Sequence, residues 1–130
     1  MDPSKLRYAK THEWAYLDKN VVTVGISKFA ADQLTDITFV ELPDPGDHVF
    51  AGQEFGNIET VKAVSDLYAP IDGEVVEVNS GLEEDPSPLQ KDPFGGGWLI
   101  KVRVEKTAAD ALAHLMTPEQ YQKQIESEQH

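Results

Sequence analysis

Short runs rich in β-branched residues, each ended by turn-forming residues, make up most of the chain before its C-terminal region. Such runs are typical of strands, because branched and aromatic side chains pack well on a pleated surface. Turn residues interrupt them about every ten residues, a spacing typical of all-β sandwiches and barrels. Strands are predicted over residues 21–26, 39–42, 49–50, 55–61, 67–69, 74–78 and 98–104. The pattern predicts a mainly β fold, decorated by short helices.

A weak internal repeat accompanies these strands. The pattern Pro-x-x-Gly-x-x-Val occurs at 43–49 and again at 70–76, with Lys62 between the two copies. A match at three common residue types is a weak signal by itself. It suits a fold made of two β-halves with a hairpin in the middle.

Helices are expected at a few places between and after the strands. Ser27 is a good N-cap for a short helix over 28–34, because its hydroxyl can accept from a backbone N–H of the first turn. The acidic, proline-rich segment 83–94 is predicted to have no regular structure.

The C-terminal region changes from a strand period to a helical one. Thr107 resembles the N-cap of a capping box, and Thr117, which a proline follows, is a stronger helix start. We expect a helical segment over about 108–128, joined to a hairpin-containing core over about 21–104. The whole chain, 1–130, is predicted to form a single domain.

Composition excludes several function classes. The chain has 11 Lys and Arg against 23 Asp and Glu, a formal net charge of −12. Such a surface repels phosphate backbones and anionic lipids, so nucleic-acid binding and a membrane role are not expected. The chain has no cysteine, which excludes disulfides, thiolate metal ligands and a thiol nucleophile. The four histidines lack ligand spacing, so we predict no metal site.

The location expected from the sequence is the bacterial cytoplasm. No apolar run approaches the roughly 18 residues that a membrane span needs, and the first ten residues resemble neither a signal peptide nor a transit peptide. A mature protein of the mitochondrial matrix, recloned with an initiator Met, would look the same.

One lysine stands alone in the acidic part of the chain. Between Lys28 and Lys91 the only Lys or Arg is Lys62, whereas the same stretch holds fourteen acidic residues. Extended residues run into and out of Lys62, which predicts a position near the tip of a hairpin. An amine there is accessible to an enzyme that attaches a prosthetic group, although a plain surface turn could also contain a lysine.

The residues around Lys62 resemble the attachment motif of lipoyl carriers. The segment Glu59-Thr60-Val61-Lys62-Ala63 is similar to the pattern Glu-Ser/Thr-x-Lys-Ala, with Thr60 in place of the more usual serine. Biotin carriers usually flank their lysine with Met, which Val61 and Ala63 do not match.

Further blocks along the chain resemble glycine cleavage system H proteins, in the order seen in that family. The resemblance runs from about residue 8 to residue 121. The blocks are His12-Glu13-Trp14, Val24-Gly25-Ile26, Phe39-Val40-Glu41-Leu42-Pro43, Ser65-Asp66, Ala69-Pro70, Gly73-Glu74-Val75, Glu77-Val78-Asn79, Asp92-Pro93-Phe94 and Gly97-Trp98.

This resemblance implies a fold and a function. The fold would be a lipoyl/biotinyl-type flattened β-barrel or sandwich with a central lipoyl hairpin and C-terminal helices. Lipoate on Lys62 would accept an aminomethyl group from glycine at a pyridoxal-phosphate decarboxylase (P protein) and pass it to a tetrahydrofolate-dependent aminomethyltransferase (T protein). Dihydrolipoamide dehydrogenase (L protein) would then reoxidise the dithiol. The chain would be a non-catalytic carrier whose partners are these three enzymes and the enzyme that attaches the lipoyl group.

The resemblance also implies roles for residues outside the attachment motif. Thr11, Glu13 and Asp66 would hydrogen-bond the amine-bearing end of the loaded arm, since a carboxylate stabilises a charged amine. Without the resemblance, His12 and Glu13 would be interpreted as an ordinary surface pair.

Three alternatives remain open from the sequence. One is an H-like protein that relays lipoyl groups without serving glycine cleavage. Another is a lipoyl domain of a 2-oxo acid dehydrogenase complex, although those usually belong to longer chains with flexible linkers. The third is an unmodified β-sandwich interaction module.

Overall fold

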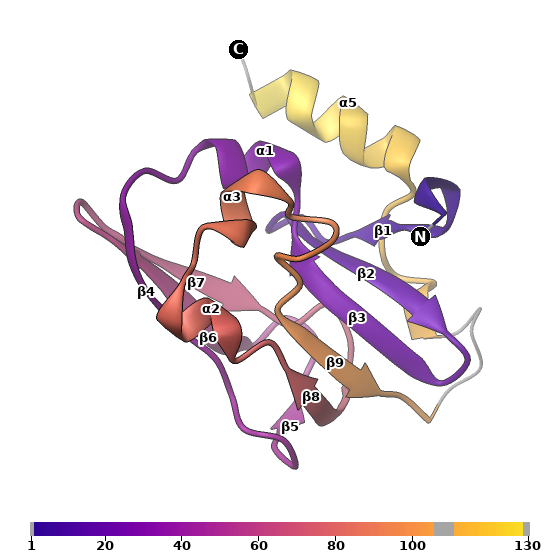
Figure 1. The fold of residues 1–130 in the computed structure, drawn as a ribbon. Coiled ribbons are helices and arrows are strands. Elements are labelled where there is room, and N and C mark those ends of the chain that lie inside the picture. The colour runs from indigo at the N-terminus through magenta and orange to yellow at the C-terminus, as the bar shows by residue number, and fades with distance from the viewer. Residues whose placement is uncertain (1, 106–110, 129–130) are drawn as a thin grey trace.

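The computed structural model describes residues 2–105 and 111–128, and two antiparallel sheets form its body (Figure 1). The six-stranded sheet has the order β1 (Arg7–Tyr8), β2 (Glu13–Asp18), β3 (Val21–Ile26), β9 (Ile100–Arg103), β8 (Gly73–Val78) and β5 (His48–Val49). The three-stranded sheet has the order β4 (Ile37–Glu41), β6 (Glu54–Thr60) and β7 (Val64–Tyr68). The mainly β prediction is confirmed, and the two sheets do not join into one closed barrel.

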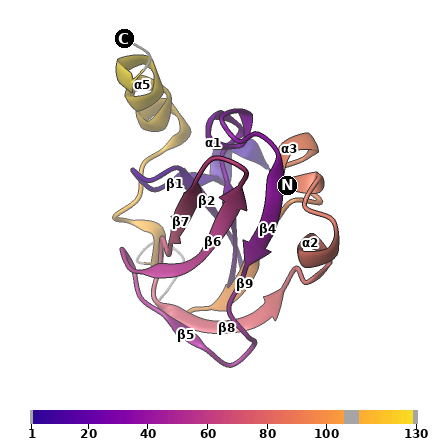
Figure 2. The ribbon, with the colours of Figure 1, turned by 90° about the vertical axis from the view of Figure 1, so that its left-hand side faces the viewer.

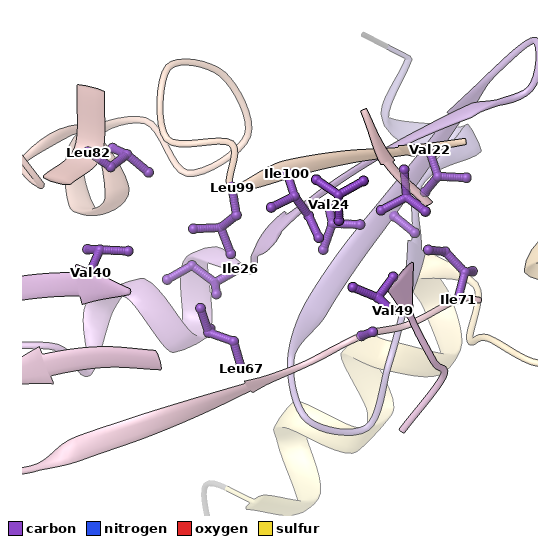
Figure 3. Close-up of a cluster of buried hydrophobic side chains, with 14 of the residues drawn as sticks. Val22, Val24, Ile26, Val40, Val49, Leu67, Ile71, Leu82, Leu99 and Ile100 are labelled. Atoms are coloured by element: carbon purple, nitrogen blue, oxygen red, sulfur yellow. The ribbon is translucent and has the colours of Figure 1, made fainter. Parts of the chain in front are cut away.

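The inner faces of both sheets share one apolar core. Along β3 the buried residues alternate with half-buried ones at the start of the strand, as expected for a strand with one face against a core. Figure 3 shows side chains from both sheets in the same cluster, and each such burial stabilises the fold by about 1.5–3 kcal/mol. Its members include Val22, Val24, Ile26, Val40, Ile58, Leu67, Val75, Ile100 and Val102.

The two copies of the Pro-x-x-Gly-x-x-Val repeat lie together in the fold. His48 of β5 is paired with Glu74 of β8, and the N–H of Gly46 donates to the carbonyl of Val75 at 2.7 Å. This pairing brings together the chain on either side of the hairpin formed by β6 and β7. The chain therefore leaves β5 for the hairpin and returns from it to the neighbouring strand β8.

Three short helices lie between the strands, of which the sequence predicts one and misses two. The cap predicted at Ser27 is confirmed for α1 (Lys28–Asp32), where the serine Oγ accepts from the N–H of Ala30 at 3.2 Å. The prediction of no regular structure over 83–94 is wrong, because α2 (Gly81–Glu84) and α3 (Pro88–Lys91) lie in or overlap it. Each of these two helices buries one leucine in the core, Leu82 or Leu89, and this tertiary burial outweighs the weak local helix signal.

The C-terminal helix α5 (Pro118–Glu128) begins at the predicted capping box. The N–H of Gln120 donates to Thr117 Oγ1 at 3.2 Å, and Gln120 Oε1 accepts from the N–H of Thr117 at 2.9 Å. The helix packs through Tyr121 onto a second apolar cluster, which contains Leu6, Tyr8 and Trp14. The start of the helix predicted from Thr107 lies outside the described residues.

Candidate functional site

Lys62 lies where the sequence predicts it, at the tip of the hairpin between β6 and β7. The two strands are antiparallel, and the last paired residues before the turn are Glu59 and Val64. Figure 1 shows the tip projecting from the body on the side away from α5 and both termini. Lys62 is exposed, and its amine has no hydrogen bond or ion pair with any other residue that the structure describes.

The turn that carries Lys62 is held by the backbone and by one side chain of the motif. The N–H of Thr60 donates to the carbonyl of Ala63 at 2.8 Å, and Thr60 Oγ1 accepts from the N–H of Ala63 at 3.1 Å. The N–H of Val61 donates to the carbonyl of Asp36, in the segment between α1 and β4, at 3.2 Å. The threonine of the motif therefore shapes the turn, while the lysine side chain between these contacts is free to move.

Glu13 provides the second candidate feature, a buried carboxyl at the start of β2. Its side chain is 1 % exposed, and it accepts from the Thr11 hydroxyl and, through Oε2, from the backbone N–H of Tyr68 at 3.1 Å. Burial raises the pKa of Glu13 to about 7, and the hydrogen bonds from Thr11 and Tyr68 lower it and so limit the rise. The interpretation of His12 and Glu13 as an ordinary surface pair is wrong, because Glu13 lies inside the fold.

A groove of about 380 Å³ lies beside Glu13. Segments far apart in the sequence line it: residues 8–11, residues 51–52, the end of β7 with the residues that follow it, and the segment 114–116. Thr11 and Tyr68, the two groups that donate to the Glu13 carboxyl, both belong to this lining. A small, partly apolar group could therefore occupy the groove with its polar end at Thr11.

The structure brings together two of the three residues expected to hold the loaded arm. Thr11 and Glu13 are in direct contact. Asp66 is exposed on β7, two residues before Tyr68, and therefore points to the same face of the strand as Tyr68. Its carboxylate has no hydrogen bond to Thr11 or Glu13 within the described part of the chain. The strand β7 thus connects the lysine-bearing tip with the groove.

Sequence reasoning missed the contacts that position Thr11 and the loop leading into Glu13 of β2. His12 in that loop has a positive φ of 80°, and its carbonyl accepts from the N–H of Ser27 at 2.9 Å. The Tyr121 hydroxyl lies 2.6 Å from His12 Nδ1 and 2.6 Å from Ser27 Oγ, and His12 Nε2 lies 3.2 Å from a carboxylate oxygen of Glu128. The one signal in the sequence is the spacing of four between Tyr121 and Ile125, which places both on one face of the last helix, and both pack in the second apolar cluster.

The carboxylate of Glu128, which can only accept, decides which group donates in each of these hydrogen bonds. His12 Nε2 faces the carboxylate of Glu128 and so carries the hydrogen, which in the neutral ring leaves Nδ1 as an acceptor. The Tyr121 hydroxyl then donates to Nδ1 and accepts from the Ser27 hydroxyl. One chain of hydrogen bonds therefore fastens α5 to the loop beside the groove.

Among residues 2–105 and 111–128, no group of three His, Cys, Asp or Glu side chains could hold a metal ion. Within the same ranges no helix has the length and apolar character needed to cross a membrane.

A β-sandwich that presents an unpartnered lysine at the tip of a projecting hairpin, with a small groove at the other end of the same hairpin strand, has the architecture of a carrier domain for a covalently attached group. Comparison with known proteins identifies the family of carriers to which the chain belongs. Residues 6–128 match the sequence model of the family described as glycine cleavage H-protein, and the chain belongs to that family. The family supports the role of lipoyl carrier in glycine cleavage.

Individual relatives agree over nearly the whole chain. The chain is 48 % identical over 127 residues to the glycine cleavage system H protein of Rubrobacter xylanophilus, covering 98 % of this chain and 97 % of the relative. It is 51 % identical over 123 residues to a probable glycine cleavage system H protein of Natronomonas pharaonis, covering 95 % of each. The crystal structure of the H protein from Mycobacterium marinum superimposes with a TM-score of 0.85 at 37 % identity, covering 95 % of this chain and 98 % of that one.

Proposed function

We propose that Lys62 is the residue to which the lipoyl group of this glycine cleavage carrier is attached. The observation that carries the proposal is the unpartnered amine of Lys62 at the projecting tip, within a turn clamped by Thr60 and Ala63. Glu59, Thr60, Val61 and Ala63 complete the attachment motif around it.

The surroundings of Lys62 fit a lipoyl group joined through an amide. In forming that amide, the amine gives up a proton and bonds to the carboxyl carbon of lipoate, from which an activating group leaves. Lys62 has no ion pair with another described residue, so neutralising its charge breaks no contact of the fold. Attachment therefore removes no hydrogen bond or ion pair among the described residues.

The groove beside Glu13 supports the second part of the proposal, which concerns where the arm rests. When bound, the lipoyl group supplies a disulfide that takes up an aminomethyl group together with two electrons. Thr11, Glu13 and Asp66 hold the amine-bearing end. Because burial raises the pKa of Glu13 to about 7, its carboxyl is partly protonated at neutral pH. A cationic amine at hydrogen-bond distance favours the carboxylate form, which in turn stabilises the amine.

The rest of the chain acts as a scaffold in this proposal. The protein is a non-catalytic carrier that forms one domain over residues 1–130, and the apolar core shared by both sheets supports the single domain. Its partners are the pyridoxal-phosphate decarboxylase, the tetrahydrofolate-dependent aminomethyltransferase, dihydrolipoamide dehydrogenase and the lipoyl-attaching enzyme. The cytoplasm is the proposed location.

Glycine–bicarbonate exchange with the partner decarboxylase tests the function. The lipoylated wild type should support exchange, and Lys62→Arg should support none, because a guanidinium cannot be acylated in its place. Lys28→Arg is the matched control, since Lys28 is also exposed but pairs with Asp32 on α1, and it should behave as the wild type. Exchange that survives Lys62→Arg would refute the proposal. A lipoylated protein that supports no exchange would instead favour lipoyl relay.

A further inference from the structure

We propose that the outer edge of β7 from Val64 to Asp66, here called the β7 edge, is a docking site for the lipoyl-attaching enzyme. An extended, basic segment of that enzyme would pair with it as an added strand. The inference rests on the proposed attachment at Lys62, which lies two residues before the β7 edge. The occupant is identified by its chemistry: a strand with unpaired backbone groups and Lys or Arg side chains.

The backbone of β7 has one side without a partner strand. β7 is the last strand of the three-stranded sheet and is paired only with β6, as Figure 2 shows. In an antiparallel pair, successive residues alternate between those whose N–H and C=O face the neighbour and those whose N–H and C=O face away. Thr60 and Ala63 are hydrogen-bonded to each other at the turn. Counting from Ala63, Ser65 faces β6, whereas Val64 and Asp66 face away from it.

Contacts at the other end of β7 confirm this alternation. Tyr68 belongs to the same set as Val64 and Asp66, and its N–H donates away from β6, to Glu13. Ala69 belongs to the opposite set, and its N–H donates to the carbonyl of Gln53, just before β6, at 2.9 Å. The outward groups at Tyr68 are thus partly used by the protein itself. Within the described residues, the backbone N–H and C=O groups of Val64 and Asp66 have no such partner beyond the hairpin.

Several features that commonly protect a strand edge are missing from the β7 edge: it has no proline, no lysine and no bulge on its own strand, and Val64, Ser65 and Asp66 are exposed. Its one charged side chain, Asp66, disfavours pairing with an acidic strand but not with a basic one. β7 has the sequence Val-Ser-Asp-Leu-Tyr, and Val64 is 59 % exposed. By contrast, the Tyr8 position of the β1 edge is covered, because Tyr8 and Met116 exchange backbone hydrogen bonds at 2.9 and 2.8 Å. The open edge beside Lys62 can therefore pair with a strand from a partner protein.

The acidic residues around the β7 edge favour a basic partner strand. Asp66 lies on the edge, Glu59 lies directly across from Val64, and Glu41 lies across β6 in the row that contains Asp66. A second copy of this chain would bring the same acidic residues and another net charge of −12, so self-pairing is disfavoured. A segment carrying Lys or Arg is attracted to the same row. A strand paired here would lie about 4.8 Å from β7, which fixes the tip for acylation.

Proline at position 64 tests the inference with a minimal change. Because the N–H of Val64 points away from β6, Val64→Pro removes the outward donor and no hydrogen bond of the hairpin. Val64→Thr is the matched control, since it keeps the N–H and the branched side chain. With a lipoate–protein ligase, lipoate and ATP, we expect kcat/KM for acylation to fall about tenfold in Val64→Pro, as for one lost hydrogen bond, and to stay within about twofold of wild type in Val64→Thr. Intact mass follows the reaction.

Amide hydrogen exchange on the wild type provides a second test that needs no variant. With the ligase bound to a non-reactive lipoyl-adenylate analogue, exchange at Val64 and Asp66 should slow at least tenfold, while Ser65, already turned toward β6, should change little. Unchanged exchange at Val64 and Asp66, or equal acylation of the two Val64 variants, would overturn the inference. Slowing in concentrated protein without ligase would also overturn it and indicate self-pairing. A wild type that the ligase does not acylate would instead refute attachment at Lys62.

Discussion

The lysine-bearing tip and the loop around Glu13 are built in opposite ways. Val61 at the tip is 70 % exposed, and a few hydrogen bonds of the turn hold the residues around Lys62. Where that loop enters β2, Glu13 is 1 % exposed and Trp14 is fully buried. The tip presents a side chain to other molecules, whereas the loop keeps a carboxyl away from water. A carrier needs both, because the group must be reached by enzymes and sheltered between visits.

The two regions differ most in how deeply their side chains are buried. Truncating one side chain in each region measures what that difference contributes to stability. Trp14→Ala should lower the free energy of unfolding by about 3–5 kcal/mol, because it removes the indole that stacks on Phe94 and donates through Nε1 to the carbonyl of Pro93 at 3.1 Å. Val61→Ala at the tip should change it by less than about 0.5 kcal/mol. Urea unfolding followed by circular dichroism measures both. Similar costs for the two variants would contradict the contrast.

The buried carboxyl predicts a pH dependence that the exposed tip lacks. Because the pKa of Glu13 is raised from 4.5 to about 7 in the fold, the folded protein binds more protons than the unfolded chain between these values. The contribution of Glu13 to stability is therefore fully present below pH 4.5 and is lost as the pH rises to about 7. The loss amounts to about 3 kcal/mol.

The variant Glu13→Gln isolates this effect from the other carboxylates. The amide stays neutral, and the Thr11 hydroxyl can rotate to accept from it. Relative to wild type, Glu13→Gln should gain about 3 kcal/mol in the free energy of unfolding between pH 4.5 and pH 8. Parallel stability curves for the two proteins over that range would show that Glu13 titrates at its ordinary pKa.

The hydrogen-bond chain through Tyr121 explains how the loop is held, and its removal should have a smaller effect. Tyr121→Phe leaves His12 Nδ1 without its donor and Ser27 without an acceptor, which should cost about 1–2 kcal/mol in thermal or urea unfolding. Tyr16→Phe is the control, because the Tyr16 hydroxyl has only a long contact of 3.4 Å with the N–H of Asp2. Equal effects of the two substitutions would mean that α5 is held by apolar packing alone.

The smallest effect is expected at the tip itself. Thr60→Ala removes the side-chain hydrogen bonds to Ala63 and should lower stability by about 0.5–1 kcal/mol, whereas Thr60→Ser should retain them. The backbone bond between Thr60 and Ala63 remains in both variants. We expect acylation by a lipoate–protein ligase to slow about twofold in Thr60→Ala. Identical stability of Thr60→Ala and Thr60→Ser would show that the backbone alone shapes the turn.

Features with a local cause could be predicted from the sequence. Ser27 and Thr117 cap helices through bonds to residues three positions away, so the residues that make the cap are adjacent in the chain. The turn at Lys62 is equally local, because Thr60 and Ala63 close it. Strand period and turn residues were sufficient to place the lysine at a hairpin tip.

Features with a distant cause could not be predicted in the same way. Glu13 is buried because β2 reaches Tyr68, 55 residues later in the chain, and no pattern around Glu13 indicates that contact. The helices α2 and α3 form where Leu82 and Leu89 enter a core built by other segments. Resemblance to a family suggested the role of Glu13, whereas only the structure gives its burial and the physical reason for its raised pKa.

The central claim is that the carried group is attached at Lys62, and peptide mass measures it most directly. The protein is co-expressed with a lipoate–protein ligase in medium containing lipoate, then digested with a protease that cleaves outside residues 59–66. The peptide containing Lys62 should gain the mass of one lipoyl group, and fragmentation should place the gain on Lys62. An unchanged mass of that peptide, or a lipoyl group on another lysine, would contradict the account.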